Sequence, residues 1–400
     1  MRKLLNIWPP LPISVCHDAQ DSDGENENTV AMLKHRGRVS EISISIISRR
    51  RSVLERLTAE MLESFPVLVS LSLSYGGDTT PGPVLPASLL GGFAPSLQTI
   101  VLGGVAFPAL PTLLSSTAQL TSLQLWKTPN AGYISPEAMA TCLAELPNLE
   151  DLRIGFTCRL EDSSPPFPAR SILPSLTSFH FEGSSEYSEN FLARIDAPIL
   201  QTLSITFRDI ILHIPQLYHF LSCAERPDPP NRVMIGFDYW RVTLKFMPSN
   251  NFEVVIGCDN LTGHLSSMAV VCRDLSPILS RVERLDFRGE RVAWFQAWVD
   301  EIQGPTSPDW LGLFSPFIAV RSLYVSRELG RNVAPALEEL TKERAAAVFP
   351  KLRTLFMEGL QLSGPVRDAI VAFVVTRQAS GHPVAFQQWT PMPESHTPYS

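Results

Sequence analysis

The amino-acid sequence predicts an α/β solenoid, in which a curved parallel sheet carries helices on its convex side. Two observations lead to this prediction. A short apolar phrase, L-x-x-L-x-L or a variant of it, recurs along the chain, and segments with helical spacing of apolar residues separate its copies. Parallel strands need crossover connections, which are usually helices, so this alternation favours a parallel sheet that is covered by helices on one side.

Each copy of the phrase ends in alternating apolar residues, as a half-buried strand does. In one clear copy, Leu123 and Leu125 should face the core, while Gln124 and Trp126 point to the opposite side. The copies begin at Val39, Leu68, Leu97, Leu120, Leu149, Leu176, Leu200, Val282, Val320 and Leu352. Most successive copies begin about 20–29 residues apart, which is the period of leucine-rich repeats. We therefore expect an irregular leucine-rich-repeat-like solenoid.

The segments between the phrases carry signals for helices. Ser135 is a capping residue, Pro136 suits the first helical position, and Glu137 lies near the positive end of the helix dipole. Another helix is expected from Pro365 to Gln378, where apolar residues follow helical spacing. Further helices are expected at about 52–63, 187–195, 214–224, 264–275, 292–302, 309–315 and 333–346.

The chain is expected to have three parts. Residues 1–38 form an N-terminal segment that packs as a cap and contains a mobile acidic loop from Asp18 to Glu27. Residues 39–389 form the solenoid, and residues 390–400 form a disordered tail. Within the solenoid, residues 226–262 lack a clean phrase and are interpreted as a degenerate repeat with an inserted hairpin. The short strands expected there are Val233–Phe237, Val242–Phe246 and Val254–Ile256.

Composition restricts the possible partners. The chain is 44% hydrophobic, which is enough for a sizeable core, and its net charge of -7 argues against binding to a nucleic-acid backbone. No apolar stretch approaches the ~18 residues of a membrane span, and none near the start has the length of a secretory signal. The six cysteines are scattered without a C-x-x-C pair. We therefore expect an intracellular protein, cytoplasmic or nuclear, with reduced thiols and without a nucleic-acid or membrane partner.

No catalytic motif is present in the sequence. It contains no G-x-S-x-G, H-E-x-x-H, Walker or G-x-G-x-x-G motif, so we expect no enzyme activity and no cofactor. The neighbours Cys16 and His17 cannot supply a tetrahedral metal site alone. Trp294 and Trp298 are four residues apart, and with Trp310 they are expected to pack helices onto the sheet rather than to line a ligand site.

The candidate binding surface is the row of strand residues that point away from the core. In solenoids such a row forms a continuous surface and is the usual binding face. Trp, Tyr and Arg are enriched among the residues that anchor protein interfaces. The candidate protein-binding residues are Gln124, Trp126, Asp151, Arg153, His180, Glu182, Arg284, Asp286, Arg288, Tyr324, Phe356 and Glu358.

Several longer phrases resemble one group of proteins. These include the segments from Leu85 to Pro95, Gly132 to Met139, Ala193 to Pro198, Phe356 to Pro365 and Ser380 to Pro383. In this order they resemble the F-box proteins with a leucine-rich-repeat-like C-terminal region that occur in mushroom-forming (basidiomycete) fungi. The resemblance covers the chain from its start to about Trp389.

The resemblance implies the target-recognition region of a ubiquitin-ligase substrate receptor. In that family an N-terminal F-box binds the Skp1-type adaptor of a cullin ubiquitin ligase, and the repeat region captures a target protein. The opening segment from Arg2 to Pro12 resembles the part that follows the F-box in the family. An adaptor is therefore expected as a partner only if an F-box lies upstream. Two alternatives stay open: a structural or degenerate repeat protein without a ligand, and a hydrolase-type enzyme, which would need a pocket with converging titratable groups.

Overall fold

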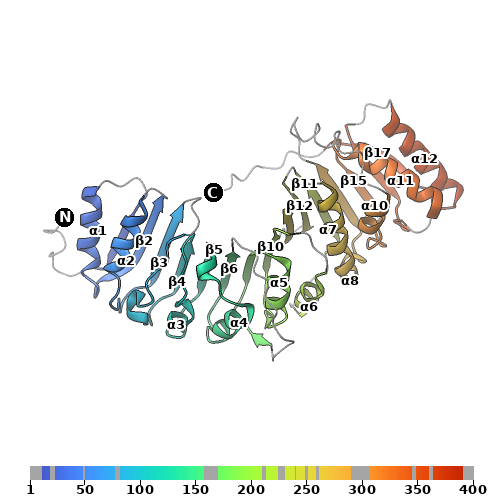
Figure 1. Cartoon of the computed structure of the whole chain (residues 1–400). Coiled ribbons are helices and arrows are strands. Elements are labelled where there is room, and N and C mark those ends of the chain that lie inside the picture. Colours follow the sequence, from blue (N-terminus) through green and yellow to red (C-terminus); the bar gives the residue numbers. More distant parts are fainter. Residues whose placement is uncertain are drawn as a thin grey trace. The chain divides into compact units, whose positions relative to one another are not determined.

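The computed structural model divides into two compact units, which we describe separately. The first unit comprises Met1–Leu203 and His219–Glu225, and the second comprises Ser204–Tyr218 and Arg226–Ser400. Both are α/β units with a mostly parallel sheet (Figure 1). The structure describes residues 11–18, 23–47, 50–76, 82–156, 170–209, 213–223, 230–238, 240–247, 251–257, 261–289, 307–344, 348–359 and 364–390.

The first unit contains a parallel run of strands in sequence order. Each strand pairs with the next, and Leu71, Ile100, Leu123 and Leu152 occupy matching positions on neighbouring strands. The strands are β1 (Ile13–His17), β2 (Val39–Ile47), β3 (Ser70–Gly76), β4 (Thr99–Gly103), β5 (Ser122–Thr128), β6 (Asp151–Phe156) and β8 (Ser178–Gly183). The boundary between the units falls within β10 (Thr202–Phe207).

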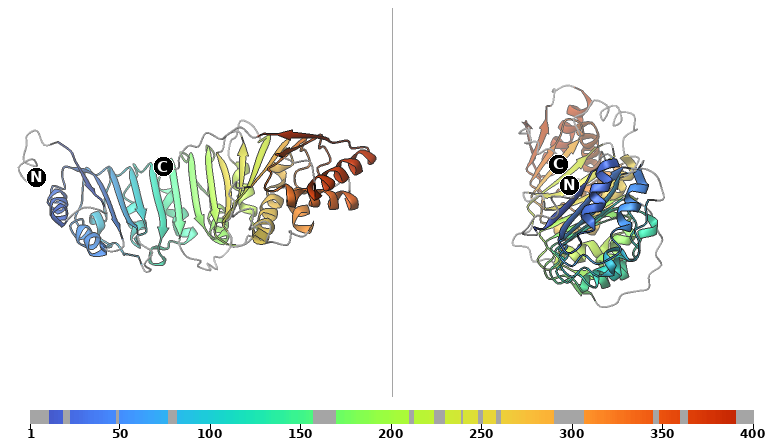
Figure 2. Two further views of the ribbon diagram at one scale, coloured as in Figure 1. Left: turned by 90° about the horizontal axis from the view of Figure 1, so that it is seen from above. Right: turned by 90° about the vertical axis from the view of Figure 1, so that its left-hand side faces the viewer.

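The helices of the first unit lie on one face of these strands (Figures 1 and 2). They are α1 (Asp23–Leu33), α2 (Arg51–Ala59), α3 (Leu110–Leu114), α4 (Pro136–Ala144) and α5 (Ser185–Leu192), with the short 3-10 helices η2 (Leu89–Gly92) and η3 (Asn130–Gly132). A separate two-stranded sheet pairs β7 (Ser171–Ile172) with β9 (Ile195–Asp196). Helix α6 (Pro215–Cys223) contains residues of both units.

In the second unit, an antiparallel segment precedes a parallel one. Strands β13 (Phe252–Gly257), β12 (Arg241–Met247) and β11 (Arg232–Phe237) pair antiparallel in that spatial order. Strand β11 then pairs in parallel with β14, which starts the parallel run β14–β17. The run comprises β14 (Arg284–Gly289), β15 (Ser322–Val325), β16 (Thr354–Glu358) and β17 (Ala385–Trp389). The three short strands expected within 226–262 are thus present.

Helices also cover one face of the second unit (Figure 2). They are α7 (Leu261–Asp274), α8 (Ser276–Leu279), α10 (Ser307–Phe314), α11 (Gly330–Arg344) and α12 (Pro365–Ala379). The predicted helices of both units are therefore present within a few residues of their expected bounds, except that 292–302 lies outside the described residues. The Ser135 cap is confirmed, because its side-chain Oγ accepts a hydrogen bond of 3.2 Å from the backbone N–H of Ala138.

The apolar positions of the ten phrases form the strand side of the core. All of them are buried, including Leu123, Leu152, Leu203 and Leu355. This follows from the pleat of a strand, which turns alternate side chains to opposite faces. Trp310 is also buried, 6.2 Å from the ring of Phe287, which confirms its predicted core role, while Trp294 and Trp298 lie outside the described residues.

The prediction of a mobile acidic loop over residues 18–27 is wrong from Asp23 onward. That part of the chain forms the start of α1, which packs against β1 in the first unit. The helix buries Asn26 and Thr29 together with Met32 and Leu33, residues three or four apart that share one face. Two of these four residues are polar, so the apolar residues of the segment did not by themselves reveal the buried face of the helix.

Candidate functional site

The candidate residues lie on strands, and they fall into two groups, one in each unit. We call the first group the first strand face: Gln124, Trp126, Asp151, Arg153, His180 and Glu182. We call the second group the second strand face: Arg284, Asp286, Arg288, Tyr324, Phe356 and Glu358. Nearly all of these side chains are partly or fully exposed, on positions that alternate with buried apolar residues.

Polar contacts on the first strand face centre on Asp151. Its carboxylate Oδ2 accepts hydrogen bonds from Gln124 Nε2 at 2.9 Å and from Ser122 Oγ at 3.0 Å. Both donors lie on β5, and the acceptor lies opposite them on β6. Strand pairing therefore orients this carboxylate, while Arg153 on the same strand stays exposed.

Trp126 lies flat across the neighbouring strand because Gly103 has no side chain. Gly103 is the register partner of Trp126 on β4, and a Cβ atom added there would collide with the indole ring. The backbone bends directly after Trp126, where Lys127 has φ of 50° and the pairing of β5 with β6 shifts. This arrangement gives the first strand face a half-buried aromatic surface.

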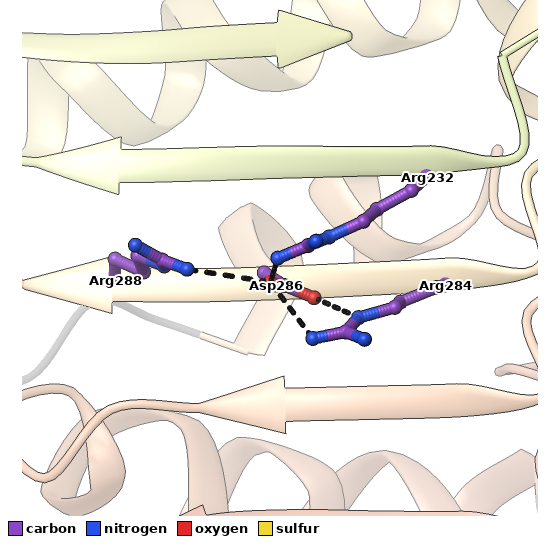
Figure 3. A network of polar contacts seen from close by, with 4 residues as sticks. All are labelled: Arg232, Arg284, Asp286 and Arg288. Carbon is purple, nitrogen blue, oxygen red and sulfur yellow. Dashed lines mark hydrogen bonds and ion pairs between the residues drawn. The ribbon is translucent and has the colours of Figure 1, made fainter. Parts of the chain in front are cut away.

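The second strand face is built around Asp286, which three arginines surround (Figure 3). Its Oδ2 lies 2.5 Å from Arg232 Nη2, and its Oδ1 lies 2.9 Å from Arg284 Nε. Arg288 Nη2 is 3.8 Å from Oδ2. Strand register explains the cluster: Arg284 and Arg288 flank Asp286 on the same face of β14, and Arg232 of β11 pairs with Arg284.

Asp286 itself is not an exposed surface residue, contrary to the prediction. Its side chain is 1% exposed, whereas those of Arg232, Arg284 and Arg288 are 25%, 35% and 27% exposed. The long arginine side chains cover the shorter aspartate, and the charge is tolerated there because it is paired and hydrogen-bonded. Asp286 therefore positions the arginines and is not available to a partner.

An aromatic stack adjoins this cluster. Tyr324 of β15 and Phe356 of β16 stack with ring centroids 4.2 Å apart and planes inclined by 5°. Trp389 of β17 meets Tyr324 edge-on at 5.4 Å. On the side of β14, the guanidinium carbon of Arg284 lies 3.7 Å from the Tyr324 centroid, which is a cation–π contact. The cluster and the stack are therefore one continuous arrangement.

Two members of this arrangement, Arg232 and Trp389, were not among the predicted site residues. Arg232 lies in the region without a clean phrase, and only the antiparallel segment brings its strand beside β14. Trp389 lies on the last strand, which pairs with β16 in register with Glu358. Alternation of buried apolar residues within β11 was a usable signal for Arg232, but the sequence did not show which strand would lie beside it. Strand β17 carries no such alternation, so Trp389 had no comparable signal.

Across the ranges that the structure describes, no group of three His, Cys, Asp or Glu side chains could hold a metal ion. His17 is buried, with Nδ1 3.4 Å from Thr29 Oγ1. Cys272 of α7 is a buried thiol, and desolvation raises its pKa. Neither residue lies on a strand face defined above.

Comparisons with known proteins do not assign a family. Neither the protein-family models nor the curated proteins include a match to this chain. In the described part of the chain, no helix combines the length and the apolar character needed to cross a bilayer.

Proposed function

We propose that this chain is a leucine-rich-repeat-like solenoid that binds another protein through its strand faces and has no catalytic activity. In this proposal it is the target-recognition region of an F-box-type ubiquitin-ligase substrate receptor that acts in the cytoplasm or nucleus. A Skp1-type adaptor would be a further partner only with an F-box upstream.

The observation that carries the proposal is the cluster of partly exposed arginine and aromatic side chains on the second strand face. In each unit the helices lie on the opposite side of the strands, so they do not cover the strand faces (Figure 2). Arg, Tyr and Trp are the residue types that contribute most to binding at protein interfaces. Tyr324, Phe356 and Arg284 hold one another in place, which lowers the entropy that binding would cost.

Affinity capture with tagged variants tests the binding part of the proposal. Wild type is compared with Trp126→Ala, with Arg288→Ala and with the double variant, all checked for folding by circular dichroism. We expect the set of recovered proteins to shrink in at least one single variant and most in the double variant. Equal recovery of the same partners at the same level by all four proteins would show that the strand faces are not the binding surface.

The ubiquitin-ligase part needs its own test. An F-box can be fused before this chain, and the fusion combined with a reconstituted cullin ligase and a partner identified by the capture experiment. We expect ubiquitin transfer to that partner with the wild-type fusion and a loss of transfer with the double variant. A partner that binds but is never modified would restrict the proposal to protein binding alone.

A further inference from the structure

Strand β17 is an edge strand, and its outer side is open in the part of the chain that the structure describes. It pairs there with β16 alone, in parallel and without a register shift. The backbone N–H of Ala385 donates to the carbonyl of Arg353, the residue before β16, at 2.8 Å. Because backbone groups point to alternate sides along a strand, those of Phe386 and Gln388 point away from β16. These two residues therefore offer N–H and C=O groups to a further strand.

This edge lacks the features by which proteins usually block an open strand. Such features are charged residues, a proline or a bulge in the edge strand. Strand β17 reads Ala-Phe-Gln-Gln-Trp, and no Asp, Glu, Lys or Arg occurs from Gly381 to Pro393. Strand β1 of the first unit, which has one partner strand among the described residues, differs. Pro12 precedes β1, and its pairing with β2 is irregular at Ile13.

The helix side of β17 is also incompletely covered. Leu355 and Met357 of β16 are buried, whereas their register partners on β17 are not. Phe386, which pairs with Leu355, is half-buried, and Gln388, which pairs with Met357, is exposed. Phe386 therefore keeps apolar surface that a strand on the open side of β17 would bury, and such burial favours association.

The strand is complementary to itself when two copies of it run antiparallel. With a twofold axis at Gln387, Phe386 of each copy faces Gln388 of the other, and their outward backbone groups exchange hydrogen bonds. Ala385 then lies opposite Trp389 of the second copy, so that a small side chain meets a large one. The two Phe386 side chains lie diagonal to each other, within the reach of aromatic rings. This register uses the outward groups of both residues.

Charge also favours a second copy at this edge. The whole chain has a net charge of -7, so two copies repel each other at most approaches. At β17 no like charges would lie opposite each other, because the strand carries none. A charged segment of another protein would find no charge within β17 to select it.

We propose that β17 pairs antiparallel with β17 of a second copy of this chain, about a twofold axis at Gln387, so that the two sheets become continuous. Each copy uses the same residues, as in any interface with twofold symmetry. One pair of short strands is a small contact, so the dimer is weak and depends on concentration. The proposal goes beyond the proposed function and is independent of it, because it concerns the edge of the sheet and not the strand faces.

Sedimentation velocity of the full chain tests the association. We expect a reversible shift from monomer to dimer as the protein concentration rises through the micromolar range. Added salt should raise the dimer fraction, since it screens the repulsion between two acidic chains. A monomer at every concentration would overturn the proposal, and so would a dimer that salt dissociates, because its contacts would then be ionic.

Two substitutions at Gln388 locate the contact. Gln388→Pro removes an N–H that points away from β16, so the pairing with β16 and the fold should remain, which circular dichroism checks. Each dimer loses this donor twice, and we expect the association constant to fall about tenfold or more. Gln388→Ala, the matched control, keeps the N–H and should dimerise as the wild type does. Equal association of the proline variant and the wild type, or an equal loss in both variants, would place the contact elsewhere.

Cysteine substitution tests the position of the axis. In the proposed register the two Gln387 residues face each other without backbone hydrogen bonds between them, with Cα atoms about 4.5 Å apart. Gln387→Cys should therefore form a disulfide between copies under mild oxidation, since disulfides span roughly 4.4–6.8 Å between Cα atoms. Ala385→Cys is the control on the same face of β17. Its two copies would lie about 14 Å apart along the strands, so it should not form this disulfide.

Peptide mass spectrometry identifies which positions are linked, and wild type treated in the same way accounts for the native cysteines. We expect the symmetric linkage through position 387 and none through position 385. Equal linkage of both variants, or no linkage through position 387 in a chain that dimerises, would refute the antiparallel pairing at β17. The capture experiments with Trp126→Ala and Arg288→Ala are unaffected by either result, so the proposed function stands or fails separately.

Discussion

The ring of Tyr324 is sandwiched between the guanidinium group of Arg284 and the ring of Phe356. The guanidinium carbon lies 3.7 Å from the ring centroid, and the Phe356 centroid lies 4.2 Å from it. Tyr324 and Phe356 are register partners on adjacent parallel strands, whereas Arg284 is the register partner of Ser322 and reaches the Tyr324 ring diagonally. Arg284 also bonds Asp286, so the ion cluster and the aromatic stack support each other.

Removing the central carboxylate should destabilise the second unit. Asp286→Ala leaves three neighbouring arginines without the anion that holds them together. We expect the free energy of unfolding to fall by about 1–3 kcal/mol, the usual effect of losing hydrogen bonds to a charged group. Urea denaturation measures this loss, and added salt should reduce it by screening the repulsion.

A control for the Asp286 experiment is available three residues earlier, directly before β14. Glu283→Ala removes an exposed carboxylate that lies 3.3 Å from Arg321, with both side chains 51% exposed. Exposed ion pairs contribute only about 0–1 kcal/mol, so this variant should unfold almost as wild type does. Equal losses in the two variants would mean that burial of Asp286 has no energetic importance.

Gly103 and Trp126 should show strong energetic coupling. Gly103→Ala places a methyl group where the indole ring lies, and we expect it to cost about 1–3 kcal/mol of stability. In a Trp126→Ala background the same substitution should cost much less, because the ring is no longer there. A double-mutant cycle followed by thermal or urea unfolding measures the coupling. An identical cost in both backgrounds would show that the ring does not occupy that position.

The alternation of buried and exposed residues along β6 can be tested with neighbouring positions. Leu152 is fully buried, whereas Arg153 is exposed. Leu152→Ala should lower the free energy of unfolding by about 2–5 kcal/mol, through lost burial and a residual cavity. Arg153→Ala should change it by no more than about 0.5 kcal/mol. If Arg153→Ala proved more destabilising than Leu152→Ala in urea denaturation, the buried face of β6 would be assigned wrongly.

Thiol labelling should separate the cysteines by burial. Cys16 and Cys223 are exposed, while Cys272 is buried and its pKa is raised by desolvation. Since the thiolate is the reactive form, native protein should be labelled at Cys16 and Cys223 long before Cys272. Peptide mass spectrometry after timed alkylation measures the rates, and denaturant should bring Cys272 to the rate of the others. Fast native labelling of Cys272 would contradict its burial.

The same thiol predicts a dependence of stability on alkaline pH. The folded protein holds Cys272 in its neutral form, and the unfolded chain can ionise it above a pKa of ~8.5. The stabilisation is therefore complete below that pH and is lost as the pH rises above it. Wild type should lose stability between mildly and strongly alkaline pH more steeply than Cys272→Ala, as measured by urea denaturation. Parallel curves for the two proteins would rule this contribution out.

Much of the local structure was predictable from short stretches of chain. Alternating apolar residues identified the strands around Leu123 and Leu355, and Ser135 with Pro136 marked the start of a helix. The prediction failed where burial involved polar residues. Asn26 and Thr29 are buried on α1, and Asp286 is covered by arginines that pair with it. Hydrophobic patterns carry no information about such pairing.

The sequence by itself determined which residues alternate between core and surface, because that pattern depends only on the pleat of each strand and on the helices between strands. It therefore placed Tyr324 and Phe356 on the exposed side of their strands. The tertiary structure alone decided that Arg232 lies beside Arg284 and that Trp389 meets Tyr324. Strands β12 and β13 lie between β11 and β14 in the sequence, and they pair antiparallel, β12 with β11 and β13 with β12. The parallel pairing of β11 with β14 is therefore long-range, and it is set by the packing of the folded unit and not by any local stretch of chain.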